Sequence, residues 1–124
     1  MAKKILIVDD EVEIVGIMKF RLNSWGFEAI SAQSGAEALE VLKTVKPDLM
    51  ILDVMMPGMS GFDVLKNIKA RDDLKNIPVI MVSVASSRAE IERGLKTGAA
   101  FYFTKPYDAT ELLAKIKSIL GESK

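Results

Sequence analysis

Polar side chains able to do chemistry recur directly after runs of apolar residues. Asp9 and Asp10 follow the first run, and Asp53 follows a later one. Ser83 and Lys105 stand close behind two further runs. Each residue alone has an ordinary role open to it, such as a helix cap, a turn or a solvated surface amine. Three carboxylates, a hydroxyl and an ammonium at equivalent places instead predict one shared site.

The residue types restrict the chemistry of that site. The sequence contains no histidine and no cysteine, which excludes an imidazole base, a thiolate nucleophile and a zinc-thiolate centre. If Asp9, Asp10 and Asp53 converge, each raises the pKa of the others unless a cation lies between them. An all-oxygen donor set favours Mg²⁺, with Mn²⁺ as a substitute, over Zn²⁺. Because Mg²⁺ typically bridges carboxylates to a phosphate, the predicted reacting group is phosphoryl.

One of these carboxylates could attack phosphorus. Asp53 stands alone after its apolar run and is the best candidate to form an aspartyl phosphate. Asp10 would ligate the metal directly, and Asp9 would help as a ligand or through water. Lys105 would supply positive charge, while Ser83 would donate a hydrogen bond to a phosphoryl oxygen.

A parallel sheet is the element expected to hold these residues. Apolar runs without alternation indicate strands buried on both faces, and they occupy residues 5–8, 49–52, 79–82 and 100–103. A weaker strand is predicted at residues 28–31. Ligands of open parallel sheets bind beyond the carboxyl ends of the strands, where the polar residues stand. The predicted fold is a doubly wound α/β domain.

Five helix start signals lie between these strands. Each is a capping residue followed three positions later by an acid, as in Asp10 with Glu13, Ser34 with Glu37, Ser60 with Asp63, Ser87 with Glu90, and Asp108 with Glu111. Apolar stripes at helical spacing comprise Val12, Val15, Met18 and Leu22 in the first helix, and Leu112, Leu113, Ile116 and Leu120 in the last. Pro47, Gly98 and Gly121 are expected to end the second, fourth and fifth helices.

The composition favours one globular domain. Of 124 residues, 49% are hydrophobic and 27% charged, enough for a core and a polar surface. We expect a single domain over 1–124, with its core at 4–120 and a polar tail at 121–124. Seventeen basic residues balance seventeen acidic ones, which disfavours nucleic acid as a direct ligand. The longest apolar run, 99–103, is too short for membrane insertion, so a cytoplasmic protein is expected.

The order of these residues resembles the receiver domain of bacterial response regulators. The likeness rests on the acid pair, on DVMMPGMSG beginning at Asp53, on Ser83 and on FTKP containing Lys105. It covers residues 4–120 and implies a flavodoxin-like (βα)5 fold with strand order 2-1-3-4-5 and helices on both faces. The resemblance also implies that Asp53 accepts a phosphoryl group from a sensor histidine kinase or a histidine phosphotransfer protein. Finally, it implies Mg²⁺ ligation by Asp10, Asp53 and the backbone carbonyl of Met55.

The resemblance further implies a conformational switch. Ser83 would be the switch hydroxyl, Tyr102 the switch aromatic and Lys105 the lysine that pairs with the phosphate. Ser83 would move toward the phosphoryl group and Tyr102 would follow inward. This movement would alter the surface of the fourth helix, fifth strand and fifth helix, and so change affinity for a downstream effector or output domain. The same surface is a candidate homodimer interface. A cis peptide bond between Lys105 and Pro106 is also implied.

Some residues depart from the usual pattern of that family. Val84 follows the switch hydroxyl, where a small residue is common, so we expect its branched side chain to narrow the phosphorylation pocket. Met55 and Ala85 lie two residues beyond Asp53 and Ser83. Neither offers a polar group to orient an attacking water, so slow self-dephosphorylation is predicted.

Two other functions fit part of the pattern. A phosphatase of the haloacid dehalogenase type also forms an aspartyl phosphate, but it needs a second Asp where Met55 stands. A degenerate receiver would be an interaction module that is never phosphorylated. The presence of Asp10, Asp53, Ser83 and Lys105 argues against this alternative. Nucleotide binding lacks support, because no glycine-rich phosphate loop follows the first strand.

Overall fold

Five strands alternate with five helices within residues 2–121. The structure is a computed structural model and describes residues 2–121, so residues 122–124 of the predicted polar tail lie outside the described residues. The strands are β1 (Lys4–Val8), β2 (Glu28–Ala32), β3 (Leu49–Asp53), β4 (Val79–Ser83) and β5 (Phe101–Thr104). The helices are α1 (Val12–Ser24), α2 (Gly35–Val41), α3 (Gly61–Lys69), α4 (Arg88–Thr97) and α5 (Ala109–Leu120). Each predicted strand is present, extended or displaced by one residue.

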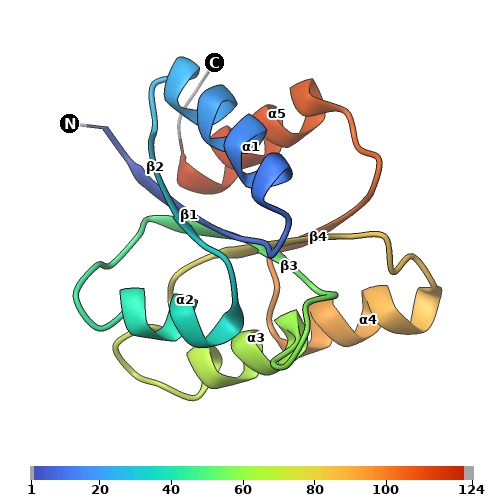
Figure 1. Cartoon of the computed structure of the whole chain (residues 1–124). Coiled ribbons are helices and arrows are strands. Elements are labelled where there is room, and N and C mark those ends of the chain that lie inside the picture. Colours follow the sequence, from blue (N-terminus) through green and yellow to red (C-terminus); the bar gives the residue numbers. More distant parts are fainter. Residues whose placement is uncertain (1, 122–124) are drawn as a thin grey trace.

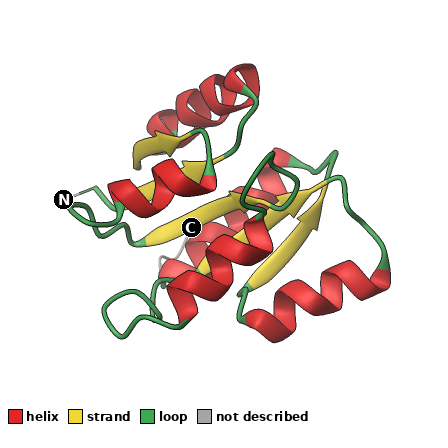
Figure 2. Ribbon diagram, turned by 60° about the horizontal axis from the view of Figure 1, so that its bottom comes forward, coloured by secondary structure: helices red, strands yellow, loops and turns green. Residues whose placement is uncertain are grey.

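The strands form one parallel sheet in the order β2-β1-β3-β4-β5, which confirms the predicted topology. Helices α1 and α5 cover one face, and α2, α3 and α4 cover the other (Figure 1). All strands point the same way, so their carboxyl ends share one edge (Figure 2). The strand order reverses between β1 and β3, and such a reversal opens a crevice at that edge.

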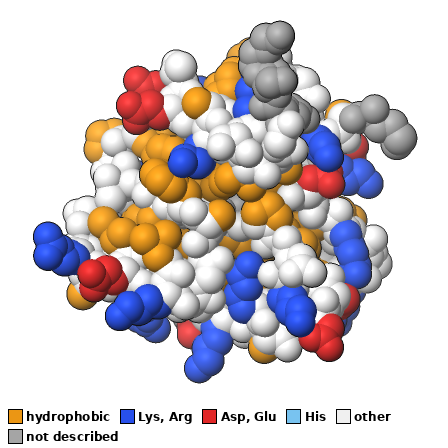
Figure 3. Space-filling view, turned by 180° about the vertical axis from the view of Figure 1, so that it is seen from behind, with side chains coloured by type: hydrophobic (Ala, Val, Ile, Leu, Met, Phe, Trp, Pro, Cys, Tyr) orange, Lys and Arg blue, Asp and Glu red, His pale blue; other side chains and the backbone are white. Residues whose placement is uncertain are grey.

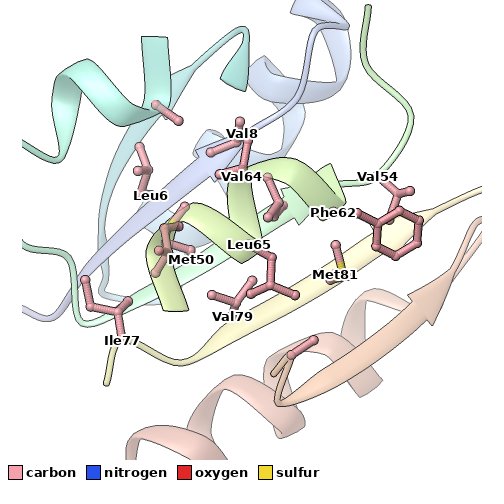
Figure 4. Close-up of a cluster of buried hydrophobic side chains, with 14 of the residues drawn as sticks. Leu6, Val8, Met50, Val54, Phe62, Val64, Leu65, Ile77, Val79 and Met81 are labelled. Carbon is pink, nitrogen blue, oxygen red and sulfur yellow. The ribbon is translucent and has the colours of Figure 1, made fainter. Parts of the chain in front are cut away.

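Apolar side chains fill both layers between sheet and helices. Toward α3 lie alternate strand residues such as Leu6, Val8, Met50, Val79 and Met81, packed on Val64 and Leu65 (Figure 4). Toward α1 and α5 lie the intervening residues, including Ile5, Ile7, Ile51 and Ile80. Because the central strands are covered on both faces, their sequences are uninterrupted apolar runs.

Most of the predicted helix caps are present. Ser34 accepts a hydrogen bond from the third helical N–H, Ser60 and Ser87 form reciprocal capping boxes with an acid, and Asp108 caps α5. Gly98 and Gly121 follow α4 and α5 with φ of +125° and +75°, a region that favours glycine. Two of the predicted α5 stripe residues, Leu113 and Leu120, are only partly buried.

The start of α1 and the end of α2 differ from expectation. Capping by Asp10 is wrong: α1 begins at Val12, its N-cap is Glu11, and the Glu11 N–H donates to Asp9 Oδ1 at 2.9 Å instead. Val12 is 63% exposed, because the buried stripe of α1 starts only at Val15. Helix α2 ends at Val41 and a turn follows, so Pro47 lies beyond the helix rather than ending it.

Apolar surface remains exposed at several places. On the side opposite the view of Figure 1, apolar side chains form a band across the middle of the molecule (Figure 3). On α1, Phe20 is 75% exposed and Ile17 is 52% exposed. None of the helices within residues 2–121 is both long enough and apolar enough to cross a bilayer.

Candidate functional site

Three carboxylates converge at the carboxyl edge of the sheet. Asp9, Asp10 and Asp53 each offer an oxygen within 4.8 Å of the others. Asp53 ends β3, and Asp9 follows β1, which pairs with β3, so the sheet register itself brings them together. Asp9 and Asp53 are only 5% and 6% exposed, while Asp10 is the most exposed of the three. The convergence inferred from the sequence is therefore present.

Lys105 reaches this cluster from the end of β5. Its Nζ lies 3.2 Å from Asp9 Oδ2, 3.7 Å from Asp53 Oδ2 and 3.8 Å from Glu11 Oε1. The backbone N–H of Lys105 donates to the Ser83 carbonyl at 2.8 Å, and its peptide bond to Pro106 is cis, as expected. Glu11 was not predicted to take part, because one more acid at a helix start looks like an ordinary first-turn residue.

Burial and charge set the protonation of these groups. Burial is the main reason that the pKa of Asp53 rises from 3.8 to about 6, and the charge of Asp9 adds to the rise. Lys105 and the Met55 N–H, which donates to Asp53 Oδ1 at 3.3 Å, partly offset the rise. Burial lowers the pKa of Lys105, but the carboxylates of Asp53 and Asp9 outweigh burial and raise that pKa overall. The site thus combines a carboxylate whose ionisation is opposed by its surroundings with an ammonium whose protonated form is favoured.

The carboxylate cluster suits a divalent cation. All the side-chain donors are oxygens, and two of the carboxylates are buried side by side with one ammonium to compensate them. Hard divalent ions prefer such donors, and a bound ion would offset the repulsion from Asp9 that adds to the rise in the Asp53 pKa. The acidic triad is therefore compatible with a divalent metal site.

Ser83 and Tyr102 lie on the α4 side of the site. Ser83 is fully buried at the end of β4, and its Oγ accepts a hydrogen bond from the Ala85 N–H at 3.1 Å. The Tyr102 hydroxyl donates to the carbonyl of the same Ala85. Although β5 is an edge strand, Tyr102 is only 7% exposed, because its ring points inward beneath α4. Ala85 therefore contacts both residues through its backbone.

A surface groove adjoins the acidic cluster. Its volume is about 410 Å³, and it is lined by Ile14, Ile17, Met18, Arg21, Val84, Lys105, Pro106 and Tyr107. Val84 is 63% exposed and lies in the wall of this groove, rather than among the buried residues of the site. The groove was not predicted from the sequence, although apolar residues on more than one side of α1 were a usable signal.

Comparison with known proteins agrees with this geometry. A family model described as "Response regulator receiver domain" matches residues 5–117. The chain is 39% identical over 123 residues to the alkaline phosphatase synthesis transcriptional regulatory protein PhoP of Bacillus subtilis, covering 99% of this chain and 50% of that protein. It is 38% identical over 120 residues to the phosphate regulon transcriptional regulatory protein PhoB of Escherichia coli, covering 97% and 52%.

A solved structure matches over nearly the whole chain. The signal receiver domain of a signal transduction histidine kinase from Syntrophus aciditrophicus has a TM-score of 0.90 and 34% identity, covering 97% of this chain and 91% of that chain. The chain spans about half the length of the curated relatives that it matches.

Proposed function

The chain belongs to the response regulator receiver domain family, the phosphoaccepting signalling domains of two-component systems, and on this premise we propose that Asp53 accepts the phosphoryl group. The placement of the Asp53 carboxylate carries the proposal: it is 6% exposed, within 4.8 Å of two other carboxylates and 3.7 Å from the Lys105 ammonium. Asp9 is held more tightly, by Lys105 at 3.2 Å and by the Glu11 N–H at 2.9 Å. Asp53 is therefore the freer of the two buried carboxylates.

We propose Mg²⁺ as the divalent ion of the site, with Mn²⁺ as a substitute. Asp9, Asp10, Asp53 and the backbone carbonyl of Met55 would hold it, because together they form an all-oxygen donor set of the kind that Mg²⁺ prefers. When bound, the ion supplies positive charge against the repulsion between the carboxylates and the phosphoryl oxygens.

The chain's own residues then carry out the transfer. An Asp53 oxygen forms a bond to phosphorus while the phosphorus–nitrogen bond of a phosphohistidine breaks, and that bond's electron pair stays on the imidazole nitrogen. Lys105 stays protonated, because its pKa is raised, and it stabilises the negative oxygens. The Ser83 hydroxyl, whose Oγ accepts from the Ala85 N–H, would turn its proton to a phosphoryl oxygen.

The product changes the surface presented to partners. Movement of Ser83 toward a phosphoryl group on Asp53 would disturb the Ala85 backbone, to which the Tyr102 hydroxyl is bonded. Tyr102 belongs to β5, so the disturbance would reach the surface formed by α4, β5 and α5. We propose this surface as the contact for a downstream effector, an output domain or a second copy of the chain.

A histidine kinase partner follows from the family, and we assign its docking, or that of a phosphotransfer protein, to the groove beside α1. The groove is continuous with the site, because Lys105 lines it and also pairs with Asp53. Its walls include Ile17 and Val84, which are 52% and 63% exposed. A cytoplasmic location is part of the same proposal.

Phosphorylation by acetyl phosphate tests the proposal. Wild type treated with acetyl phosphate and Mg²⁺ is expected to gain the mass of one phosphoryl group, removable by hydroxylamine. Asp53→Asn and wild type in excess EDTA are expected to gain none, whereas Asp72→Asn, which alters a carboxylate 97% exposed, is expected to label like wild type. If wild type gains no mass from acetyl phosphate or from histidine kinases, the chain is a degenerate receiver. Turnover of a phosphate ester would instead indicate a phosphatase.

A further inference from the structure

Gly94 occupies the buried side of α4, in the middle of the helix. Glycine is among the least favourable residues in a helix interior. The backbone conformation does not call for it, since Gly94 is absent from the glycines with positive φ among the described residues. The reason for a glycine at position 94 is instead the small space between the helix and the side chains beneath it.

A side chain at this position would crowd both Met81 and the switch aromatic. An added Cβ would lie 2.9 Å from Met81 Sδ, 3.1 Å from Tyr102 Cδ2 and 3.4 Å from Tyr102 Cε2. Met81 and Tyr102 are register partners on β4 and β5, so their side chains stand next to each other on the face that α4 covers (Figure 4 shows Met81 there). The Tyr102 ring therefore occupies the room that the missing side chain leaves.

The ring is held at its other end as well. The Tyr102 hydroxyl donates to the Ala85 carbonyl, and the Ala85 N–H donates to Ser83 Oγ. We propose that Gly94 is a positioning residue that lets Tyr102 lie inward and so connects Ser83 to the β5 surface. What this connection is used for rests on the proposed function, but the placement of the ring does not.

The two neighbours of Gly94 would respond differently to a methyl group. Met81 has a flexible thioether side chain and can move its sulfur aside. The Tyr102 ring is rigid and fixed both at β5 and at Ala85. An alanine at position 94 would therefore press on the ring and displace it by a few tenths of an ångström. This displacement strains its hydrogen bond to Ala85 and favours an outward ring.

Fluorine NMR of 3-fluorotyrosine-labelled protein tests this directly. The sequence holds two tyrosines, and Tyr107, whose hydroxyl contacts Met18 Sδ, serves as the internal reference. In Gly94→Ala, the Tyr102 resonance is expected to move toward that of a solvent-exposed fluorotyrosine while the Tyr107 resonance stays in place. The pKa of the Tyr102 hydroxyl, which burial raises, is expected to fall. Tyr102→Phe assigns the resonances.

Gly16→Ala is the matched control. An added Cβ at Gly16 in α1 would meet nothing within 4 Å, so this variant gains the same helix propensity without crowding any ring. In Gly94→Ala/Met81→Ala, removal of the thioether makes room, so the Tyr102 resonance is expected to return toward its wild-type position. If Gly94→Ala alone does not fold, recovery of folding in the double variant would show the same crowding, and its failure to fold would overturn the inference.

An unchanged Tyr102 resonance in Gly94→Ala would overturn the inference, as would equal shifts in Gly94→Ala and Gly16→Ala. Acetyl phosphate labelling of Asp53 in the same samples separates the two proposals. Loss of labelling in every variant and in wild type refutes the phosphoacceptor assignment, whereas the NMR result decides the role of Gly94 by itself.

Discussion

Replacing Asp53 with asparagine is expected to stabilise the metal-free protein at neutral pH. The Asp53 carboxylate is buried beside Asp9, and both effects oppose its ionisation. In the unfolded chain the same group is solvated and ionises freely. Folding at neutral pH therefore buries the ionised carboxylate at an unfavourable position. The uncharged amide of asparagine removes this free-energy cost while keeping nearly the same shape.

The pKa of Asp53 gives the size and the pH window of the effect. It rises from 3.8 to about 6 on folding, and one pKa unit corresponds to about 1.4 kcal/mol, so the ionised carboxylate destabilises the fold by about 3 kcal/mol. Between these values the folded state holds a proton that the unfolded state has released. Stability is therefore greatest, for this group, below pH 3.8 and is lost as the pH rises through about 6.

Urea unfolding in EDTA, followed by circular dichroism across this pH range, measures the prediction. Asp53→Asn is expected to exceed wild type by about 3 kcal/mol in free energy of unfolding at pH 7, and the difference should shrink toward zero in acid. Added Mg²⁺ should also shrink it, since the ion stabilises only wild type. Asp72→Asn, a change at an exposed carboxylate, should match wild type throughout. An asparagine variant no more stable than wild type at pH 7 would refute the reasoning.

Three further outcomes are expected. Lys105→Met should raise the pKa of Asp53 further, as a carboxyl NMR titration would show. It should also slow acetyl phosphate labelling by at least about tenfold, because no cation then stabilises the negative phosphoryl oxygens. Equal labelling rates in the variant and in wild type would contradict this role of Lys105. Gly61→Ala should lower the free energy of unfolding, measured in urea, by about 1 to 3 kcal/mol. The added Cβ would lie 2.7 Å from the Val54 Cα, and a backbone atom cannot move aside as a flexible side chain can. Unchanged stability would show that α3 shifts to make room. Wild type should lose its phosphoryl group slowly, as mass spectrometry over time would show. Met55→Asn should lose it faster, because the amide can orient an attacking water. Equal lifetimes would contradict the explanation that slow loss reflects the apolar side chain at position 55.

Most of the fold could be predicted from the sequence, because the residue patterns that indicate its strands and helices are the same residues that stabilise them. Central strands buried on both faces read as apolar runs, and the caps at Ser60 and Ser87 combine a hydroxyl with an acid three residues later. The acidic cluster could be predicted for the same reason: parallel strands fix which residues end at a common edge. Asp9 and Asp53 meet because of strand register alone.

Features set by the orientation of one helix were harder to predict. The exposure of Val12, the role of Glu11 at the N-cap and the groove along α1 all depend on which side of that helix meets the sheet. An apolar residue on a helix that is apolar on several sides gives no sign of which way it faces. Gly94 likewise could not be interpreted, because a mid-helix glycine has meaning only once its neighbour across the gap is known.

Lys105 takes part in two structural features at once. The residue lines the groove, and its ammonium pairs with Asp9 and Asp53. On the proposed function, a partner docked in the groove and a phosphoryl group on Asp53 would both lie against Lys105, and each would alter the binding of the other by the same factor. Transfer of the phosphoryl group would then change the affinity of the chain for the protein that donated it.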